Sequence, residues 1–177
     1  MIPNIPSQGT TVYVGAYTGP YADCPTAMTK IRALDKVECP QTLGDLSESR
    51  SVNETKCLSS NESVKALGAI SRQSMTIDML LDPKNVKGQK VLRESFKNNS
   101  ELIVGVEIGK NTIEYFTSNV SSAGTGLSPD GAVTYKVVLE ISSAITRCHH
   151  VPAHTTTHNV VHNGKNIVHG SNNVVIG

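Results

Sequence analysis

The residues best suited to bind a metal ion lie together near the end of the sequence. All six histidines follow residue 146, and Cys148 lies beside the first of them; they are His149, His150, His154, His158, His162 and His169. Zinc takes three or four ligands of these types. In an extended chain, however, the neighbours His149 and His150 point to opposite faces. The four-residue steps from His154 to His162 suit a helix, whereas the residues around them favour strands. We predict that these histidines are exposed positions of a repeat and bind no metal or cofactor. The alternative is a metal site shared between several chains.

The sequence gives no indication of catalysis. Every histidine lies beyond the last predicted core strand, so none is placed to activate a serine or cysteine of the preceding chain. Asp78 and Asp82 fall on the polar side of an alternating strand, which is typical of a solvated face. Glycines at 105, 109, 124 and 126 lack the following helix that a phosphate-binding loop requires. We therefore predict a protein that is not an enzyme.

Composition excludes several other functions. The 177 residues carry a net charge of +1, only 4% aromatic residues and no tryptophan, so neither a basic surface nor a base-stacking platform for nucleic acid is indicated. No apolar run is long enough to cross a bilayer, and the N-terminus lacks the features of a signal peptide. We expect a cytosolic protein whose cysteines are free thiols; these are Cys24, Cys39, Cys57 and Cys148.

The dominant pattern along the chain is the two-residue alternation of half-buried strands. It is clearest at 75–82, 102–108 and 133–142, and weaker strands are predicted at 10–15, 28–34 and 112–120. One helix is predicted at 83–97. Asp82 suits its N-cap, Pro83 its first position, and Leu92 and Phe96 belong to its apolar stripe. The prediction is a mainly β domain with one helix packed on the sheet.

Two segments differ from this pattern. Residues 41–71 are polar and rich in serine, which indicates either a functional loop or a disordered one. Because aliphatic residues recur in the segment, we favour an arm that packs against a partner; the candidate interface residues are Leu43, Leu46, Val52, Leu58, Val64 and Leu67. Residues 147–177 repeat an Asn-Val/Ile-Val unit every seven residues, with Asn163-Gly164 between the first two units, and this predicts three short strands. We therefore divide the chain into a domain of residues 1–146 and an extension of residues 147–177.

The order of these motifs resembles that of the tail tube (major tail) proteins of long-tailed bacteriophages. The segment SMTIDMLLDPKNVKGQKVLRESFKNNSELIVGVEI (74–108) is similar to the central part of that family, where a strand ends in Asp-Pro, a short helix carries a GQKxLR-like sequence, and an extended strand follows. TTVYVG (10–15) resembles the opening strand and GAVTYKVVLEISSAIT (131–146) the closing strand. The resemblance covers residues 8–147, and the extension has no counterpart in it.

The resemblance implies a β-sandwich or barrel-like domain with a flanking helix, which assembles into six-membered rings. Stacked rings would form the tube of a virion tail, assembled in the host cytoplasm, through which genomic DNA passes on infection without specific binding. The implied partners are the chain itself, the tape measure protein, the tail terminator, the baseplate or tip proteins, and a sheath if the tail contracts. No cofactor, catalytic residue or membrane is implied. The extension would decorate the tube or pair with its copies on neighbouring subunits.

Two alternatives stay open from the sequence. The first is the tube subunit of a contractile injection device that carries no genome. The second, from a different class, is a binding module in which the histidine-rich extension holds a metal or a surface ligand.

Overall fold

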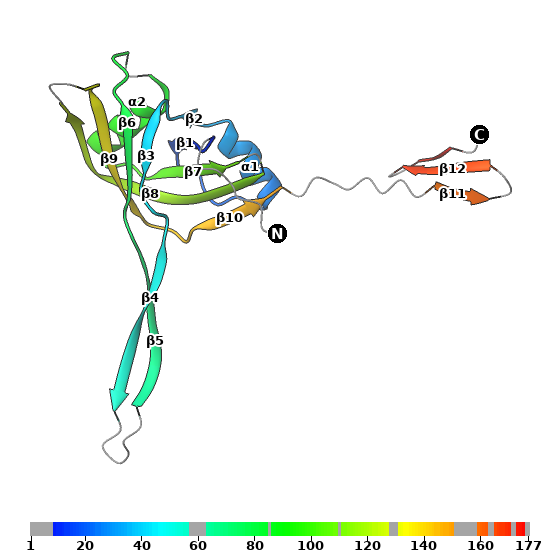
Figure 1. The fold of residues 1–177 in the computed structure, drawn as a ribbon, viewed down its shortest axis with the longest axis horizontal. Coiled ribbons are helices and arrows are strands. Elements are labelled where there is room, and N and C mark those ends of the chain that lie inside the picture. The colour runs from blue at the N-terminus through cyan, green and yellow to red at the C-terminus, as the bar shows by residue number, and fades with distance from the viewer. Residues whose placement is uncertain are drawn as a thin grey trace.

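The computed structural model describes residues 9–56, 63–84, 86–109, 111–127 and 131–150, together with the backbone of three strands within 159–175. Most of the described chain forms one antiparallel sheet (Figure 1). Its strands are β1 (Thr11–Ala16), β2 (Asp35–Lys36), β3 (Pro40–Leu43), β6 (Met75–Leu80), β7 (Leu102–Ile108), β8 (Thr112–Gly126), β9 (Thr134–Ile141) and β10 (Thr146–His149). The strand order is β2-β1-β7-β8-β9-β6-β3, with β10 also paired to β8.

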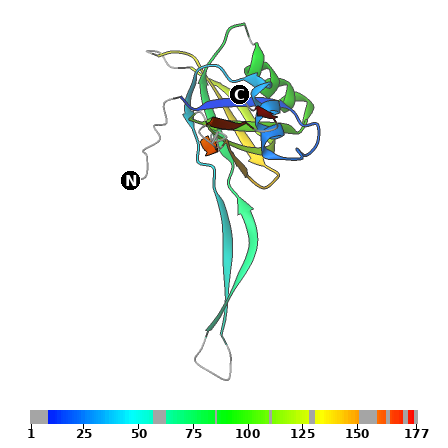
Figure 2. The ribbon, with the colours of Figure 1, turned by 90° about the vertical axis from the view of Figure 1, so that its right-hand side faces the viewer.

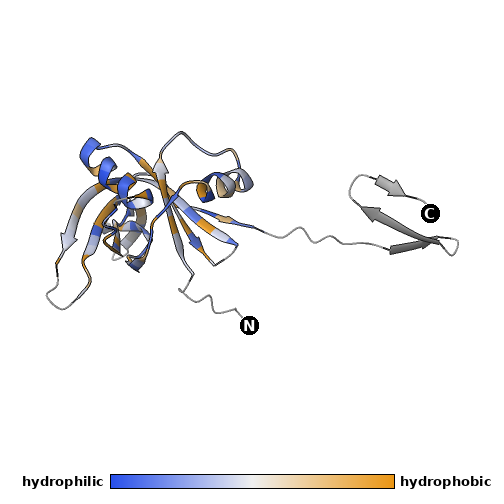
Figure 3. Ribbon diagram, turned by 90° about the horizontal axis from the view of Figure 1, so that it is seen from above, coloured by the Kyte–Doolittle hydropathy of each residue, from blue (hydrophilic) through white to orange (hydrophobic). Residues whose placement is uncertain are grey.

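The sheet curls around a main core to which strands from both of its ends contribute. Met75, Ile77 and Met79 of β6 are buried there, as the alternation predicted, and so are Val137 and Leu139 of β9. Orange and blue alternate along several elements in Figure 3, as expected where one side is buried. Strand β7 differs, because its residues from Leu102 to Val106 are all buried. The predicted mainly β, barrel-like fold is therefore confirmed.

The predicted helix is present as α2 (Lys87–Asn98), but it begins later than expected. Its N-cap position is Val86, not Asp82. The Asp82 carboxylate instead accepts hydrogen bonds from the backbone N–H groups of Lys84 (2.9 Å) and Val86 (3.5 Å), so it stabilises the turn before the helix, and Pro83 lies within that turn. Aspartate can hold either a turn or a helix start with the same carboxylate, and sequence alone does not separate the two.

The buried face of α2 is shifted from the predicted stripe, because Gln89 is buried and Phe96 is not. Leu92 is fully buried in the main core, and Gly88 and Ser95 lie on the same side of the helix. Phe96 is 44% exposed, so its assignment to the buried stripe was wrong. Small residues bring the helix backbone close to the sheet region around β2, and the bulky ring lies at the edge of the contact.

A second helix, α1 (Cys24–Arg32), replaces the strand that we predicted at 28–34. The Asp23 carboxylate accepts from the Thr26 N–H (2.8 Å) as an N-cap, and Pro25 lies in the first turn. Ala27, Met28 and Ile31 are buried at helical spacing against the face of the sheet opposite to α2. Among the described residues, no helix has both the length and the apolar character needed to cross a membrane.

The prediction of free thiols was wrong for two of the four cysteines. Cys24, at the start of α1, is joined by a disulfide to Cys148 in β10, with 5.3 Å between the Cα atoms. Our prediction used only the expected compartment, whereas the fold places these residues, 124 positions apart, side by side. Cys39 is an exposed free thiol, and Cys57 lies outside the described residues.

The C-terminal repeat forms the three strands that its period predicted. These are β11 (Asn159–His162), β12 (Lys165–Gly170) and β13 (Asn173–Val175), in one antiparallel sheet. His162 pairs with Lys165, as expected for a two-residue connection at Asn163-Gly164. The main sheet, in turn, continues through β10 to His149, three residues beyond the boundary that we placed at 146.

We predict that loss of the disulfide strongly destabilises the domain. Closing a loop of this length removes about 4–5 kcal/mol of chain entropy from the unfolded state in the loop-entropy treatment. Urea unfolding of the Cys24→Ser/Cys148→Ser variant should therefore show a markedly lower midpoint than the wild type. Cys39→Ser, at an exposed free thiol, is the matched control and should unfold like the wild type. Equal midpoints for all three proteins would contradict the prediction.

Gly88→Ala is predicted to destabilise the protein, although alanine normally favours a helix by about 1 kcal/mol over glycine. A Cβ at Gly88 would lie 2.8 Å from the carbonyl oxygen of Lys36 and 2.9 Å from the Val37 nitrogen, and both are backbone atoms. We expect a loss of about 1–3 kcal/mol from this overpacking, measured by thermal or urea unfolding. Lys97→Ala, at an exposed position of the same helix, should be nearly neutral, and a stabilising Gly88→Ala would show that the contact relaxes freely.

Candidate functional site

The segment predicted as an arm is a long β-hairpin that projects from the main sheet. Strands β4 (Glu48–Lys56) and β5 (Ser63–Arg72) pair only with each other, and they extend away from the domain as a twisted ribbon (Figures 1 and 2). All nine residues of β4 are exposed. An isolated two-stranded ribbon is marginally stable in water, and its outer edges present unpaired backbone groups. These properties are typical of a segment that pairs with or packs on a partner.

Apolar side chains lie opposite each other on this hairpin. Val52 pairs with Leu67 across the two strands, and their exposures are 59% and 70%. Ile70, which the sequence analysis missed, is 41% exposed and pairs with Arg50. Directly opposed residues of an antiparallel pair share one face of the ribbon. The hairpin therefore carries an apolar patch, which we define as Val52, Leu67 and Ile70, with no cover from the described part of the chain.

The base of the hairpin is fixed firmly to the sheet. The Gly44 N–H donates to the Thr76 carbonyl (2.7 Å), and the Ile145 N–H donates to the Glu48 carboxylate (3.4 Å). Arg72 pairs with the same carboxylate across the two strands of the hairpin (2.9 Å). A Cβ at Gly44 would lie 2.8 Å from the Thr76 nitrogen, so this close approach requires glycine. The hairpin thus projects from an anchored root.

The six predicted interface residues divide between this root and the projecting part. Leu43 and Leu46 are half-buried against the main core, so they belong to the root. Val52 and Leu67 lie on the apolar patch. The backbone of Val64 is part of β5, and its side chain lies outside the described residues, as does the whole of Leu58.

A recess opens beside the root of the hairpin. It has a volume of about 430 Å³ and combines apolar and charged side chains; among the residues that line it are Leu43, Leu46, Met75, Val106, Ile108, Glu114 and Arg147. The Glu114 side chain is 7% exposed and is paired with Arg147, whose Nε donates to the carboxylate (2.6 Å). Because the buried Glu114 carboxylate is paired with Arg147, an apolar group that enters the recess beside it does not leave an uncompensated buried ion there.

The structure brings together no metal-binding group among the described residues. His149 and His150 are exposed at the end of β10, and a ring nitrogen of His149 lies 2.9 Å from the Thr112 hydroxyl. No group of three or more His, Cys, Asp or Glu side chains within that part of the chain could hold an ion. His154 and His158 lie outside the described residues, as do the side chains of His162 and His169.

No family model matches the sequence, and no curated protein matches it. Similar solved structures do exist. A chain of the SPP1 tail tube is 13% identical, with a TM-score of 0.59 over 84% of this chain and 81% of that one. A chain from the baseplate of the anti-feeding prophage is 10% identical, with a TM-score of 0.62 over 84% and 98%. A chain from the sheath–tube complex of an extracellular contractile injection system, PVC, is 11% identical, with a TM-score of 0.56 over 82% and 92%.

These likenesses extend over most of the described chain, and they confirm the fold that the sequence motifs implied. The curled antiparallel sheet, its flanking helix and the projecting hairpin together have the fold of a phage tail tube chain.

Proposed function

We propose that this protein is a structural subunit of a phage tail tube, in which hexameric rings of the chain stack into a hollow conduit for the genome. The observation that carries the proposal is the exposed apolar patch on a hairpin two strands wide, within a fold shared with a tail tube chain. A monomer gains nothing from such a projection. In an assembly the apolar patch becomes buried, and the unpaired strand edges can pair with a neighbouring subunit.

Burial of the apolar patch would contribute favourable free energy to association of the subunits. A fully buried valine or leucine side chain contributes about 1.5–3 kcal/mol. In a ring each subunit would offer one hairpin and receive another, so small contributions are multiplied around the closed assembly. The recess beside the root is a candidate acceptor for the patch of a neighbouring subunit, because it is concave and is lined in part by apolar side chains.

The remaining surface suits a conduit. The net charge of the chain is +1, so it supplies few phosphate contacts that would hold DNA in place. In this proposal the protein is not an enzyme and needs no cofactor. It resides in the virion after assembly in the host cytoplasm and makes no membrane contact.

Further partners belong to the same proposal. They are the tape measure protein during assembly, the tail terminator and baseplate or tip proteins at the two ends, and a sheath if the tail contracts. Two of the similar chains come from a baseplate and from a sheath–tube complex, which supports contacts of these kinds.

The second candidate is the tube subunit of a contractile injection device. The likeness to chains of the anti-feeding prophage and of an extracellular contractile injection system favours it. Identification of the cargo separates the two candidates, since particles purified with the protein would hold packaged DNA only in the first.

We predict that Val52→Ser/Leu67→Ser abolishes polymerisation without unfolding the subunit. Both side chains are mostly exposed, so the free energy of unfolding should change by less than about 0.5 kcal/mol. Negative-stain electron microscopy and sedimentation of concentrated protein should show hollow rings or tubes for the wild type and monomers for the variant. The matched control is Leu127→Ser/Val133→Ser, which removes exposed apolar side chains outside the hairpin and should assemble normally.

Two outcomes would contradict the proposal at different levels. If the Val52→Ser/Leu67→Ser variant forms tubes as well as the wild type, the hairpin patch is not part of the interface between subunits. A wild-type chain that stays monomeric at high concentration, even when tube fragments are added as nuclei, would overturn the tube assignment itself.

A further inference from the structure

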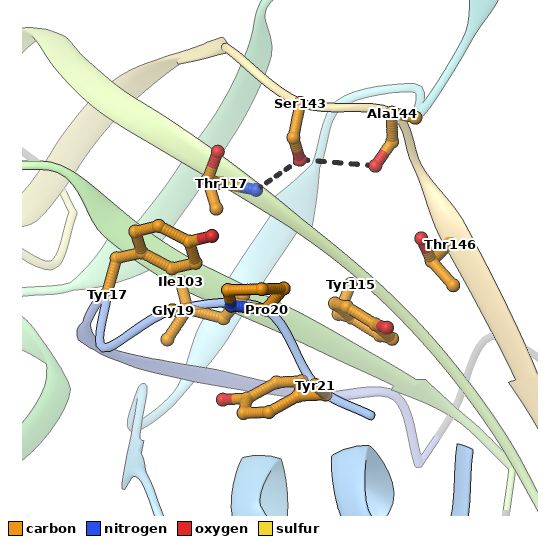
Figure 4. Close-up of a pocket in the computed structure, with 10 residues that line it drawn as sticks. All are labelled: Tyr17, Gly19, Pro20, Tyr21, Ile103, Tyr115, Thr117, Ser143, Ala144 and Thr146. Atoms are coloured by element: carbon orange, nitrogen blue, oxygen red, sulfur yellow. Dashed lines mark hydrogen bonds between the residues drawn. The ribbon is translucent and has the colours of Figure 1, made fainter. Parts of the chain in front are cut away.

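A second concave site lies on the α1 side of the sheet. It is a cavity of about 210 Å³ beside β7 and β8, bounded by the segment after β1 and by the segment between β9 and β10 (Figure 4). Its lining residues are Tyr17, Gly19, Pro20, Tyr21, Ile103, Tyr115, Thr117, Ser143, Ala144 and Thr146. We call it the tyrosine pocket. It is smaller than the ~300–1,000 Å³ of a typical cofactor site, so it suits a single ring or a short side-chain group.

Aromatic side chains are concentrated here to an unusual degree. The chain has only five tyrosines and two phenylalanines, and three of the tyrosines line this one pocket. Tyr21 and Tyr115 meet edge to face with ring centroids 5.5 Å apart, while Tyr17 is 37% exposed at the rim. Burial, followed by the proximity of Tyr115 and Tyr17, raises the pKa of Tyr21, so its hydroxyl stays a neutral donor at physiological pH.

Hydrogen bonding inside the pocket restricts the kind of ligand that it accepts. Ser143 Oγ accepts from the Thr117 N–H (2.8 Å) and donates to the Ala144 carbonyl (3.2 Å). The Thr117 hydroxyl lies 2.8 Å from Ser142 Oγ, which donates to Glu101. The polar groups of this wall are therefore already satisfied. The tyrosine hydroxyls and Thr146 are left at the margins, and no charged side chain lines the pocket.

A neutral aromatic pocket with a few marginal hydroxyls is the chemistry that recognises proline in an extended peptide. Polyproline II segments dock against aromatic-lined grooves and need few directed hydrogen bonds. A sugar, in contrast, presents many hydroxyls, and the inner wall has no free groups to meet them. Prolines three residues apart lie on one side of a polyproline II helix, about 9 Å from each other.

The sequence itself contains a segment of this kind. Residues 2–6 read Ile-Pro-Asn-Ile-Pro, two Ile-Pro units at the three-residue spacing. We propose that the tyrosine pocket binds this Ile-Pro motif from a second copy of the chain, held as a polyproline II segment. The inference rests on the proposed self-assembly and gives that assembly a second contact, distinct from the hairpin.

The geometry favours a second copy over the same chain. Tyr115 lies opposite Gly105, which lies opposite Tyr13, so the pocket begins about 16 Å from Gly9 at ordinary strand spacings. Pro6 is three residues before Gly9 and reaches about 11 Å at full extension. Within one chain, only Pro3 could span this distance. Its path would also have to pass α1, which packs on the same face of the sheet through Ile31. A neighbouring copy can present either proline ring to the pocket without this limit on reach.

The first test uses the full chain with Pro3→Ala/Pro6→Ala, so that its own motif is disabled and its pocket is free. A peptide of residues 1–8 is titrated into dilute protein, and tyrosine emission is recorded. The chain has no tryptophan and the peptide has no tyrosine, so the signal comes from the protein. We expect a saturable change with the natural peptide, and at least tenfold weaker binding of the peptide with both prolines changed to alanine.

Pocket variants in the same Pro3→Ala/Pro6→Ala background locate the binding. Tyr17→Ala should weaken the peptide at least fivefold, Tyr17→Phe should keep near-normal affinity because the ring is retained, and Leu127→Ser is the surface control. No saturable change with any peptide, or equal responses to the natural and alanine peptides, would overturn the proposal. A saturable response to a neutral oligosaccharide in place of the peptide would overturn it in favour of a glycan site.

Complementation tests whether the motif comes from a second copy. The Tyr17→Ala chain keeps the motif and loses the pocket, whereas the Pro3→Ala/Pro6→Ala chain keeps the pocket and loses the motif. Each alone should associate more weakly than the wild type in sedimentation, and a mixture should recover part of the loss. A mixture no better than its components would overturn binding between copies. A wild-type chain that does not associate would contradict the proposed function. The peptide titration would still show whether the pocket binds the Ile-Pro motif.

Discussion

Burial of both faces of the β7–β8 pair is the constraint on which the rest of the domain depends. On one face Leu102, Val104 and Phe116 enter the main core, and α2 covers them through Leu92. On the other face Ile113 packs with Ile31 of α1. A half-buried sheet tolerates small shifts of its cover, but a strand pair enclosed on both sides fixes the positions of both helices. Gly88 of α2 lies against the backbone of Lys36 and Val37, and Gly105 of β7 lies against the Ile31 side chain of α1.

This central layer also explains why the functional surfaces lie where they do. The hairpin, the tyrosine pocket and the recess all lie where strands of the sheet end or change partner. Strand β8 pairs with β7 on one side and in turn with β10 and β9 on the other, so the break between β9 and β10 leaves the opening in which Ser143 and Ala144 form one wall of the pocket. A rigid interior thus presents binding surfaces without itself changing shape.

The sequence predicted those elements whose local pattern and tertiary environment agree. Met75, Ile77 and Met79 alternate because one face of β6 is buried, and the seven-residue repeat near the C-terminus predicted its strands. The failures have particular causes. The helix α1 is only nine residues long, and its cap at Asp23 was not recognised in the sequence. Phe96 lies four residues after the buried Leu92, which is the right spacing for a buried residue. Its exposure, however, depends on how close the helix lies to the sheet, and this distance is not set by the local sequence. The tyrosine pocket draws on residues from 17 to 146, so no local motif could reveal it.

The disulfide has a mechanical consequence as well as a thermodynamic one. Any tension between the two ends of the chain passes from Cys24 directly to Cys148, because the covalent bridge is far stronger than the hydrogen bonds of the sheet. The residues between them, which include most of the sheet and the whole hairpin, form a closed loop outside the line of force. A pull on the chain after Cys148 therefore reaches the bridge before it reaches the β10 residues Thr146 and Arg147. Strands β2 to β9 thus stay inside the closed loop when the chain beyond the bridge is pulled.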